Sequence, residues 1–126
     1  IHFLFLYMNI LKSFLLVAVG GAVGSMLRYA FTLMADITLI SGQWATLAVN
    51  IIGSFLIGLL TAYCQTQTWA LLLIVGLCGG FTTYSTFSLQ TLLLIKGGQV
   101  GLGLLYAFGT LALCLVFTYI GWWVKQ

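Results

Sequence analysis

Residues 79–88 place a glycine pair, hydroxyl groups and aromatic rings inside an otherwise apolar stretch. The segment reads Gly79-Gly80-Phe81-Thr82-Thr83-Tyr84-Ser85-Thr86-Phe87-Ser88, and the apolar stretch around it runs from Trp69 to Ile95. A bilayer core contains no water, so backbone groups freed by a break in a membrane helix need a protein or ion partner. The segment therefore predicts a broken helix with a functional site at mid-membrane depth.

The two sides of such a break favour ions of opposite charge. A break near Gly80 leaves free carbonyls around Gly79 to Thr82, which favour a cation, and free amides at the start of the second half, which favour an anion. Tyr84 and Phe87 lie three residues apart on one face, and aromatic ring edges carry the positive part of the quadrupole. We expect a small-anion site there. Plain aromatic packing is the alternative, but it accounts poorly for the neighbouring glycines and hydroxyls.

Polar side chains also recur at helical spacing in two other apolar stretches. Asn50 follows Thr46 by four residues, and its amide offers two N–H donors to an anion or to another helix. Thr110, Cys114 and Thr118 form a second stripe with the same spacing. These hydroxyls either face a pore or bond back to carbonyls one turn earlier.

Arg28 is the one cation inside an apolar stretch, where a charge costs roughly 3 kcal/mol at a helix centre. No acid on the same helix lies within its reach, so its partners are backbone carbonyls, water, headgroups or an anion. A side chain that extends to the membrane interface is the simpler interpretation. A place in an anion vestibule is the alternative.

The elements that carry these residues must be membrane helices. The chain has 126 residues, of which 63% are hydrophobic and 4% charged, with no proline and a mean hydropathy of +1.21. This composition excludes a soluble domain. Four stretches are long enough to span a bilayer: Ser13–Leu33, Trp44–Cys64, Trp69–Ile95 and Gly101–Val124.

Short polar connections around Asp36–Gln43, Gln65–Thr68 and Lys96–Gln99 make consecutive helices antiparallel. We therefore expect one all-α integral membrane domain over residues 8–126, with residues 1–7 as a leader before Met8. A secretory signal peptide is disfavoured because the first apolar stretch is too long and continues past Arg28.

Charges give no clear orientation. Lys12 and Lys125 lie at one end of the predicted bundle, whereas Lys96 and Arg28 are assigned to the other. Orientation follows Lys and Arg asymmetry, so either both orientations coexist or other signals decide.

Metal chemistry based on side chains is not indicated. The three cysteines, Cys64, Cys78 and Cys114, are expected to be packed thiols, and His2 is the only histidine. Most glycines in the spans are expected to serve helix packing.

These residues together resemble the CrcB/Fluc fluoride channel family. The elements that carry the resemblance, in chain order, are Gly20-Gly21-Ala22-Val23-Gly24 before Arg28, Thr46-Leu47-Ala48-Val49-Asn50 with Gly53, the segment Gly79–Ser88, and the stripe Thr110, Cys114, Thr118. The resemblance implies four helices with the third broken, in an antiparallel dual-topology homodimer of the bacterial cytoplasmic (inner) membrane. It also implies passive fluoride export that keeps cytoplasmic fluoride low.

The resemblance further implies roles for individual residues. A central sodium ion would be held by the carbonyls of Gly79 and Thr82 in both subunits, and Arg28 would lie near a vestibule. The fluoride pathway would include Asn50, Tyr84, Phe87, Thr46, Thr86, Ser88, Thr110, Cys114 and Thr118. Three positions depart from the family pattern: Tyr84 replaces a usual phenylalanine, Gln90 a frequent glutamate, and Cys114 a serine.

Two other classes of protein are less consistent with the sequence. A small multidrug-resistance exporter needs a carboxylate embedded in the membrane, whereas the only acid, Asp36, falls in a predicted loop. An enzyme is not expected, because no nucleophile, base and acid can be assembled inside the spans without His, Asp or Glu.

Overall fold

The computed structural model describes residues 1–125, with Lys125 described by its backbone alone. Its helices, in chain order, are α1 (His2–Ile37), α2 (Gly42–Tyr63), α3 (Gln67–Trp69), η1 (Ala70–Cys78), α4 (Gly79–Phe81), α5 (Tyr84–Lys96) and α6 (Val100–Lys125). Segments α3, η1, α4 and α5 together form the third span, in which η1 is π-helical. Four helical stretches of this part of the chain are long and apolar enough to cross a membrane. The predicted all-α architecture with four spans is therefore confirmed.

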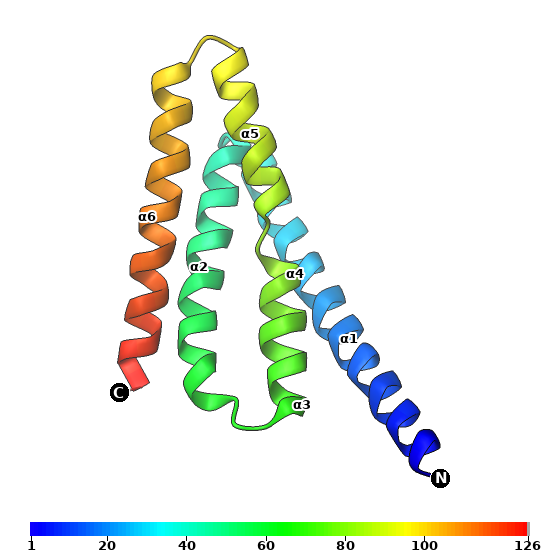
Figure 1. Ribbon diagram of the computed structural model, residues 1–126. Helices are drawn as coiled ribbons and strands as arrows, with labels where there is room; N and C mark the ends of the chain where they lie inside the picture. The colour runs from blue at the N-terminus through cyan, green and yellow to red at the C-terminus, as the bar shows by residue number, and fades with distance from the viewer. Residues whose placement is uncertain (126) are drawn as a thin grey trace.

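The connections between spans are shorter than the sequence suggested. Residues 38–41, 64–66 and 97–99 make the turns, so Asp36 belongs to the last turn of α1 and not to a loop. Gly98 has a φ of 89°, which allows the α5–α6 turn to close with a hydrogen bond from the Gln99 N–H to the Leu94 carbonyl. Both chain ends lie at the end of the bundle that carries the α2–α3 turn (Figure 1).

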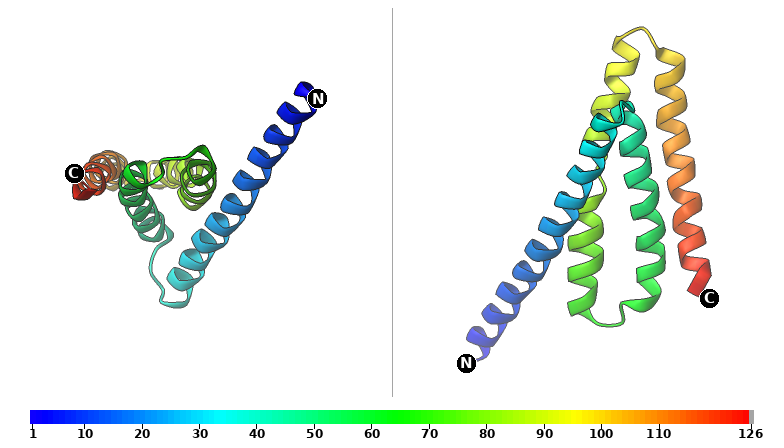
Figure 2. Two further views of the ribbon diagram at one scale, coloured as in Figure 1. Left: turned by 90° about the horizontal axis from the view of Figure 1, so that it is seen from below. Right: turned by 180° about the vertical axis from the view of Figure 1, so that it is seen from behind.

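Helix α1 is longer than the other spans and runs obliquely to them (Figures 1 and 2). Its 36 residues correspond to about 54 Å, against about 30 Å for the hydrocarbon core of a bilayer. Residues 2–7, expected as a leader outside the domain, continue this helix without interruption.

Helix packing depends on glycines that bring backbones together. Helix α2 packs mainly on α6, and α1 packs on η1 and α4. A methyl group on Gly58 would lie 2.9 Å from the Trp122 backbone nitrogen, and one on Gly121 would lie 3.0 Å from the Leu59 nitrogen. Small residues at such crossings are typical of membrane helices. They hold α2 and α6 together along one wall of the cavity described below.

Few side chains are buried, and several of the buried ones are polar. The apolar buried residues are Ala35, Val49, Cys78, Phe81 and Tyr106, whereas the polar ones are Thr46, Asn50 and Thr110. Large apolar side chains elsewhere point outward, as expected where lipid replaces water as the solvent. The polar groups therefore concentrate inside the bundle, near the break in the third span.

Candidate functional site: a broken helix beside an uncharged cavity

The third span breaks at Thr82 and Thr83, not at the glycine pair. Thr82 has φ −84° and ψ 156°, and Thr83 has φ −145° and ψ 118°, whereas Gly79 remains helical. β-Branched side chains favour such extended conformations. Gly80 instead allows close packing, because a methyl group there would lie 2.5 Å from the Gly21 carbonyl oxygen. The extended residues thus lie two and three positions after Gly80, where the sequence predicted the break.

Hydrogen bonds at the break explain which carbonyls become free. In a continuous α-helix the carbonyls of Gly79 and Thr82 would accept from the N–H groups four residues later. Here the Thr83 N–H donates to Asn50 Oδ1 at 2.9 Å, and the Thr86 N–H donates to Thr83 Oγ1 at 3.3 Å. The carbonyls of Gly79 and Thr82 thus lose these donors. Gly79 and Thr82 therefore expose oxygen ligands of the kind that hard cations prefer.

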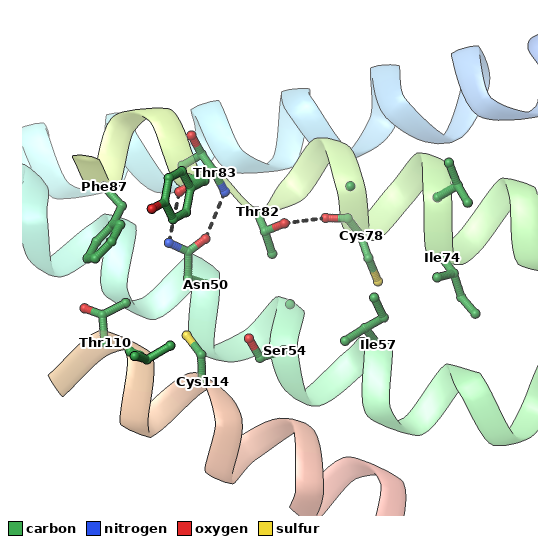
Figure 3. A pocket seen from close by; sticks show the side chains of 15 residues that line it. Asn50, Ser54, Ile57, Ile74, Cys78, Thr82, Thr83, Phe87, Thr110 and Cys114 are labelled. Atoms are coloured by element: carbon green, nitrogen blue, oxygen red, sulfur yellow. Dashed lines mark hydrogen bonds between the residues drawn. The ribbon is translucent and has the colours of Figure 1, made fainter. Parts of the chain in front are cut away.

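Asn50 bridges the break from α2. Its Oδ1 accepts from the Thr83 N–H, and its Nδ2 donates to the Thr83 carbonyl at 3.1 Å (Figure 3). This is the interhelical hydrogen bonding that the sequence left as one of two alternatives. Since an amide carries two N–H donors, the second hydrogen of Nδ2 remains for another acceptor. Asn50 thus both shapes the backbone and keeps a donor.

The predicted aromatic face forms at the start of α5. The rings of Tyr84 and Phe87 lie 5.7 Å apart, and Phe87 also lies 5.3 Å from Tyr106 on α6. Tyr84 is 80% exposed within the single chain, whereas Tyr106 is buried. The pair therefore joins the interior of the bundle to an open face.

A cavity of about 570 Å³ lies between α2, the third span and α6 (Figure 3). Seven of the residues predicted from the sequence line it: Asn50, Gly79, Thr82, Tyr84, Phe87, Thr110 and Cys114. None of its lining residues is charged. Thr110 Oγ1 is buried and has no hydrogen-bond partner within the described residues.

The other predicted pathway residues lie outside the cavity lining. Thr46 is buried one helical turn before Asn50 and neighbours the Tyr106 hydroxyl. The Thr118 hydroxyl donates to the Cys114 carbonyl at 2.8 Å, so it follows the back-bonding alternative. Thr86 accepts from the Thr83 hydroxyl at 3.1 Å, and Ser88 is exposed. The stripe on α6 therefore faces the cavity only through Thr110 and Cys114.

Arg28 turns toward the break. Its Nε donates to the Gly80 carbonyl at 3.1 Å, from a half-buried position on α1. A backbone carbonyl is one of the partners that the sequence allowed, although an exposed side chain at the interface was the simpler interpretation.

Two residues of the site were missed from the sequence. Thr83 caps α5 and pairs with Asn50, and threonine is among the residue types preferred at a helix N-cap. Tyr106 donates to Gln90 Oε1 at 2.9 Å. It extends the spacing of Thr110 and Cys114 by one turn, so the same periodicity would have identified it.

The fold and the site define a small helical protein with four membrane-spanning stretches and an uncharged cavity beside a broken third span. The profile of the CrcB-like protein, camphor resistance (CrcB) family matches residues 15–122. The chain belongs to this family.

Curated relatives match most of the chain. A Thermus thermophilus protein named fluoride-specific ion channel FluC is 46% identical over 117 residues, which cover 89% of this chain and 94% of the relative. A protein of the same name from Elusimicrobium minutum is 44% identical, and the match covers 90% of this chain and 94% of the relative. Another from Leptospira interrogans is 40% identical, and the match covers 93% of this chain and 97% of the relative. The relatives are thus named as channels.

Proposed function

We propose that this protein is a fluoride-specific channel that lets fluoride leave the cell passively and thereby keeps cytoplasmic fluoride low. The relatives' common name supports this function. The observation that carries it is the uncharged cavity, in which the buried Thr110 hydroxyl has no partner among the described residues and Asn50 keeps one N–H. Neutral donors suit a conducted anion, because they replace part of its hydration shell and still bind it weakly enough for release.

Each wall of the cavity would contribute different donors to fluoride. Asn50 supplies the amide N–H, Thr110 a hydroxyl and Cys114 a weaker thiol. Tyr84 and Phe87 supply ring edges, whose positive rim attracts an anion. Beyond the cavity, Thr46, Thr86 and Ser88 would extend the pathway, and Arg28 would lie near a vestibule.

A structural sodium ion fits the carbonyls of Gly79 and Thr82. The fit rests on these two oxygens, whose helical donors are taken by Asn50 and by the Thr83 hydroxyl. The ion would neutralise the negative end of the first half of the third span. In an antiparallel homodimer in the bacterial cytoplasmic membrane, both subunits would contribute these carbonyls.

A proton-coupled exporter has no observation in its favour. Such a protein needs a carboxylate inside the membrane. Asp36 lies exposed in the last turn of α1, far along the helix from the break.

Fluoride release from liposomes tests the channel proposal. Purified protein is reconstituted, an ionophore relieves the charge imbalance, and a fluoride-selective electrode follows efflux, with chloride efflux as the comparison. We expect fast fluoride efflux and little chloride efflux. Absent fluoride efflux, or equal rates for the two anions, would rule out a fluoride-specific channel.

Two substitutions with matched controls assign the pathway. Asn50→Ala and Phe87→Ile should each slow fluoride efflux by tenfold or more. The first variant loses a hydrogen bond to a charged group, and the second loses the positive ring edge. The controls Asn9→Ala and Phe14→Ile change the same residue types at exposed positions of α1 and should conduct like the unmodified protein. Normal efflux in both cavity variants would remove these side chains from the pathway.

A further inference from the structure

Arg28 occupies the place of a missing backbone donor. In a continuous helix the Gly80 carbonyl would accept from the Tyr84 N–H, but the break at Thr82 and Thr83 separates these groups. The Arg28 Nε–H replaces that donor at 3.1 Å. Among the carbonyls of Gly79, Gly80 and Thr82, that of Gly80 is thus the one that accepts from a side chain.

The approach of α1 to the third span puts Arg28 within reach. Gly20, Gly24 and Arg28 follow one another at four-residue spacing, so they share a face of α1. A methyl group on Gly24 would lie 2.8 Å from the Phe81 nitrogen and would overlap the Leu77 carbonyl oxygen. Helix α1 therefore meets the third span backbone to backbone immediately before Arg28.

Aromatic packing continues the same contact past Arg28. The rings of Phe31 and Phe81 meet edge to face, with centroids 5.7 Å apart. Arg28 is thus held between a glycine contact and an aromatic contact, and its bond to Gly80 is part of a built interface and not the chance contact of a mobile side chain.

We propose that Arg28 is a positioning residue for the pore: its Nε–H holds the Gly80 carbonyl and thereby fixes the break that presents Thr82, Thr83 and Asn50 to the ion pathway. The decisive property in this role is a donor at the Nε position. A vestibule residue that attracts anions would instead depend on the positive charge. The proposal rests on the channel function proposed above, but its effect on stability can be measured without fluoride flux.

Two substitutions separate the donor from the charge. Arg28→Gln removes the charge but keeps an N–H, because glutamine Nε2 lies as many bonds from Cα as arginine Nε. Arg28→Lys keeps the charge but has the Cε methylene where arginine has Nε. The lysine ammonium therefore lies one bond farther from Cα than the arginine Nε–H that it would have to replace. Lys12→Gln removes a cation from the exposed part of α1 and is the matched control.

Fluoride efflux and thermal unfolding in detergent are measured for all of these proteins. We expect fluoride efflux through Arg28→Lys to be slower than through the unmodified protein by roughly tenfold or more, because small displacements of the groups in a site have effects of this size. Efflux through Arg28→Gln should be at least about threefold faster than through Arg28→Lys. The melting temperature should fall more for lysine than for glutamine. Lys12→Gln should match the unmodified protein in both measurements.

The proposal is overturned if Arg28→Gln does not conduct fluoride faster than Arg28→Lys. Faster conduction by Arg28→Lys would show that the charge matters and the donor does not, and equal conduction would show that neither property is specific. If Arg28→Lys does not yield folded protein, the melting temperature of Arg28→Gln decides: a value near that of the unmodified protein supports the proposal, and a collapse overturns it. Absence of efflux from the unmodified protein would refute the channel function, while the melting temperatures would still test the role of Arg28.

Discussion

Thr110 is the residue whose environment is hardest to explain by folding alone. Its hydroxyl is buried, lines the cavity and has no partner in the described part of the chain. A buried polar group without a hydrogen bond costs about 1–3 kcal/mol of stability. The cost becomes understandable if the hydroxyl is reserved for a passing ion.

Thr110→Val should therefore affect stability and flux in opposite directions. Valine keeps the shape and removes the unpaired hydroxyl, so the free energy of unfolding should stay constant or rise by about 1 kcal/mol. Fluoride efflux should fall several-fold, since a donor is lost. Thermal unfolding and electrode assays on the same preparation measure the two effects.

Thr61→Val is the control for this substitution. The Thr61 hydroxyl is exposed and donates to the Ile57 carbonyl one turn earlier. Its loss should leave efflux unchanged. Unchanged efflux in Thr110→Val as well would mean that this hydroxyl is not on the fluoride pathway.

At this scale the sequence predicted residue types better than their partners. The spacing of Asn50 and Thr46 placed both on one face, and both are buried. The pairing of Asn50 with both backbone groups of Thr83 depends on how two helices meet, which periodicity within one helix does not contain. The periodicity of α6 contains Tyr106, but its partner Gln90 lies on α5 and has no signal in that pattern.

At the scale of elements, the four spans follow from apolar length, and the break falls at two β-branched residues. Gly79 and Gly80 suggested the break because glycine weakens helices in water. In this bundle Gly80 serves close packing against Gly21, and the extended residues are the β-branched Thr82 and Thr83. The π-helical turns of η1, before the break, had no signal in the apolar pattern.

Gly24→Ala tests whether the contact between α1 and the third span supports the site. The added methyl group would overlap the Leu77 carbonyl oxygen, which is backbone and cannot move aside alone. Overpacking of this kind costs about 1–3 kcal/mol. We expect a lower melting temperature and a loss of fluoride efflux.

Gly101→Ala is the matched control, because nothing lies within 4 Å of the position of its methyl group. Alanine also favours a helix over glycine by about 1 kcal/mol. The control should be at least as stable as the unmodified protein. Equal behaviour of the two variants would contradict the importance of the α1 contact.

For the whole molecule, orientation in the membrane depends on very few charges. Arg28 is engaged at the break, so Lys12 and Lys125 lie toward one end and Lys96 toward the other. This difference of one charge is small. Because the charge difference is so small, the dual-topology dimer stays a prediction. In such a dimer, the second subunit would pack on the open side of the cavity at Tyr84.

Reporters fused to the C-terminus measure the orientation. Alkaline phosphatase is active outside the cytoplasm and green fluorescent protein is fluorescent inside it, so a dual-topology protein should give both signals. Adding two lysines next to Lys96 should shift the population toward one signal. A single signal from the unmodified chain would refute both dual topology and the antiparallel dimer.

The chain contains no proline, although its third span is broken. Nothing covalent in residues 79–88 prevents a continuous helix, and the groups that hold the break open come from other spans, Asn50 on α2 and Arg28 on α1. In the two-stage view of membrane folding, the third span would therefore insert as an unbroken rod and break only when its neighbours dock. Amide exchange in a peptide of residues 67–96 in micelles should then show protection through Thr82 and Thr83. The pore would be a product of assembly, and a chain that inserts without assembling would be a closed bundle of straight helices.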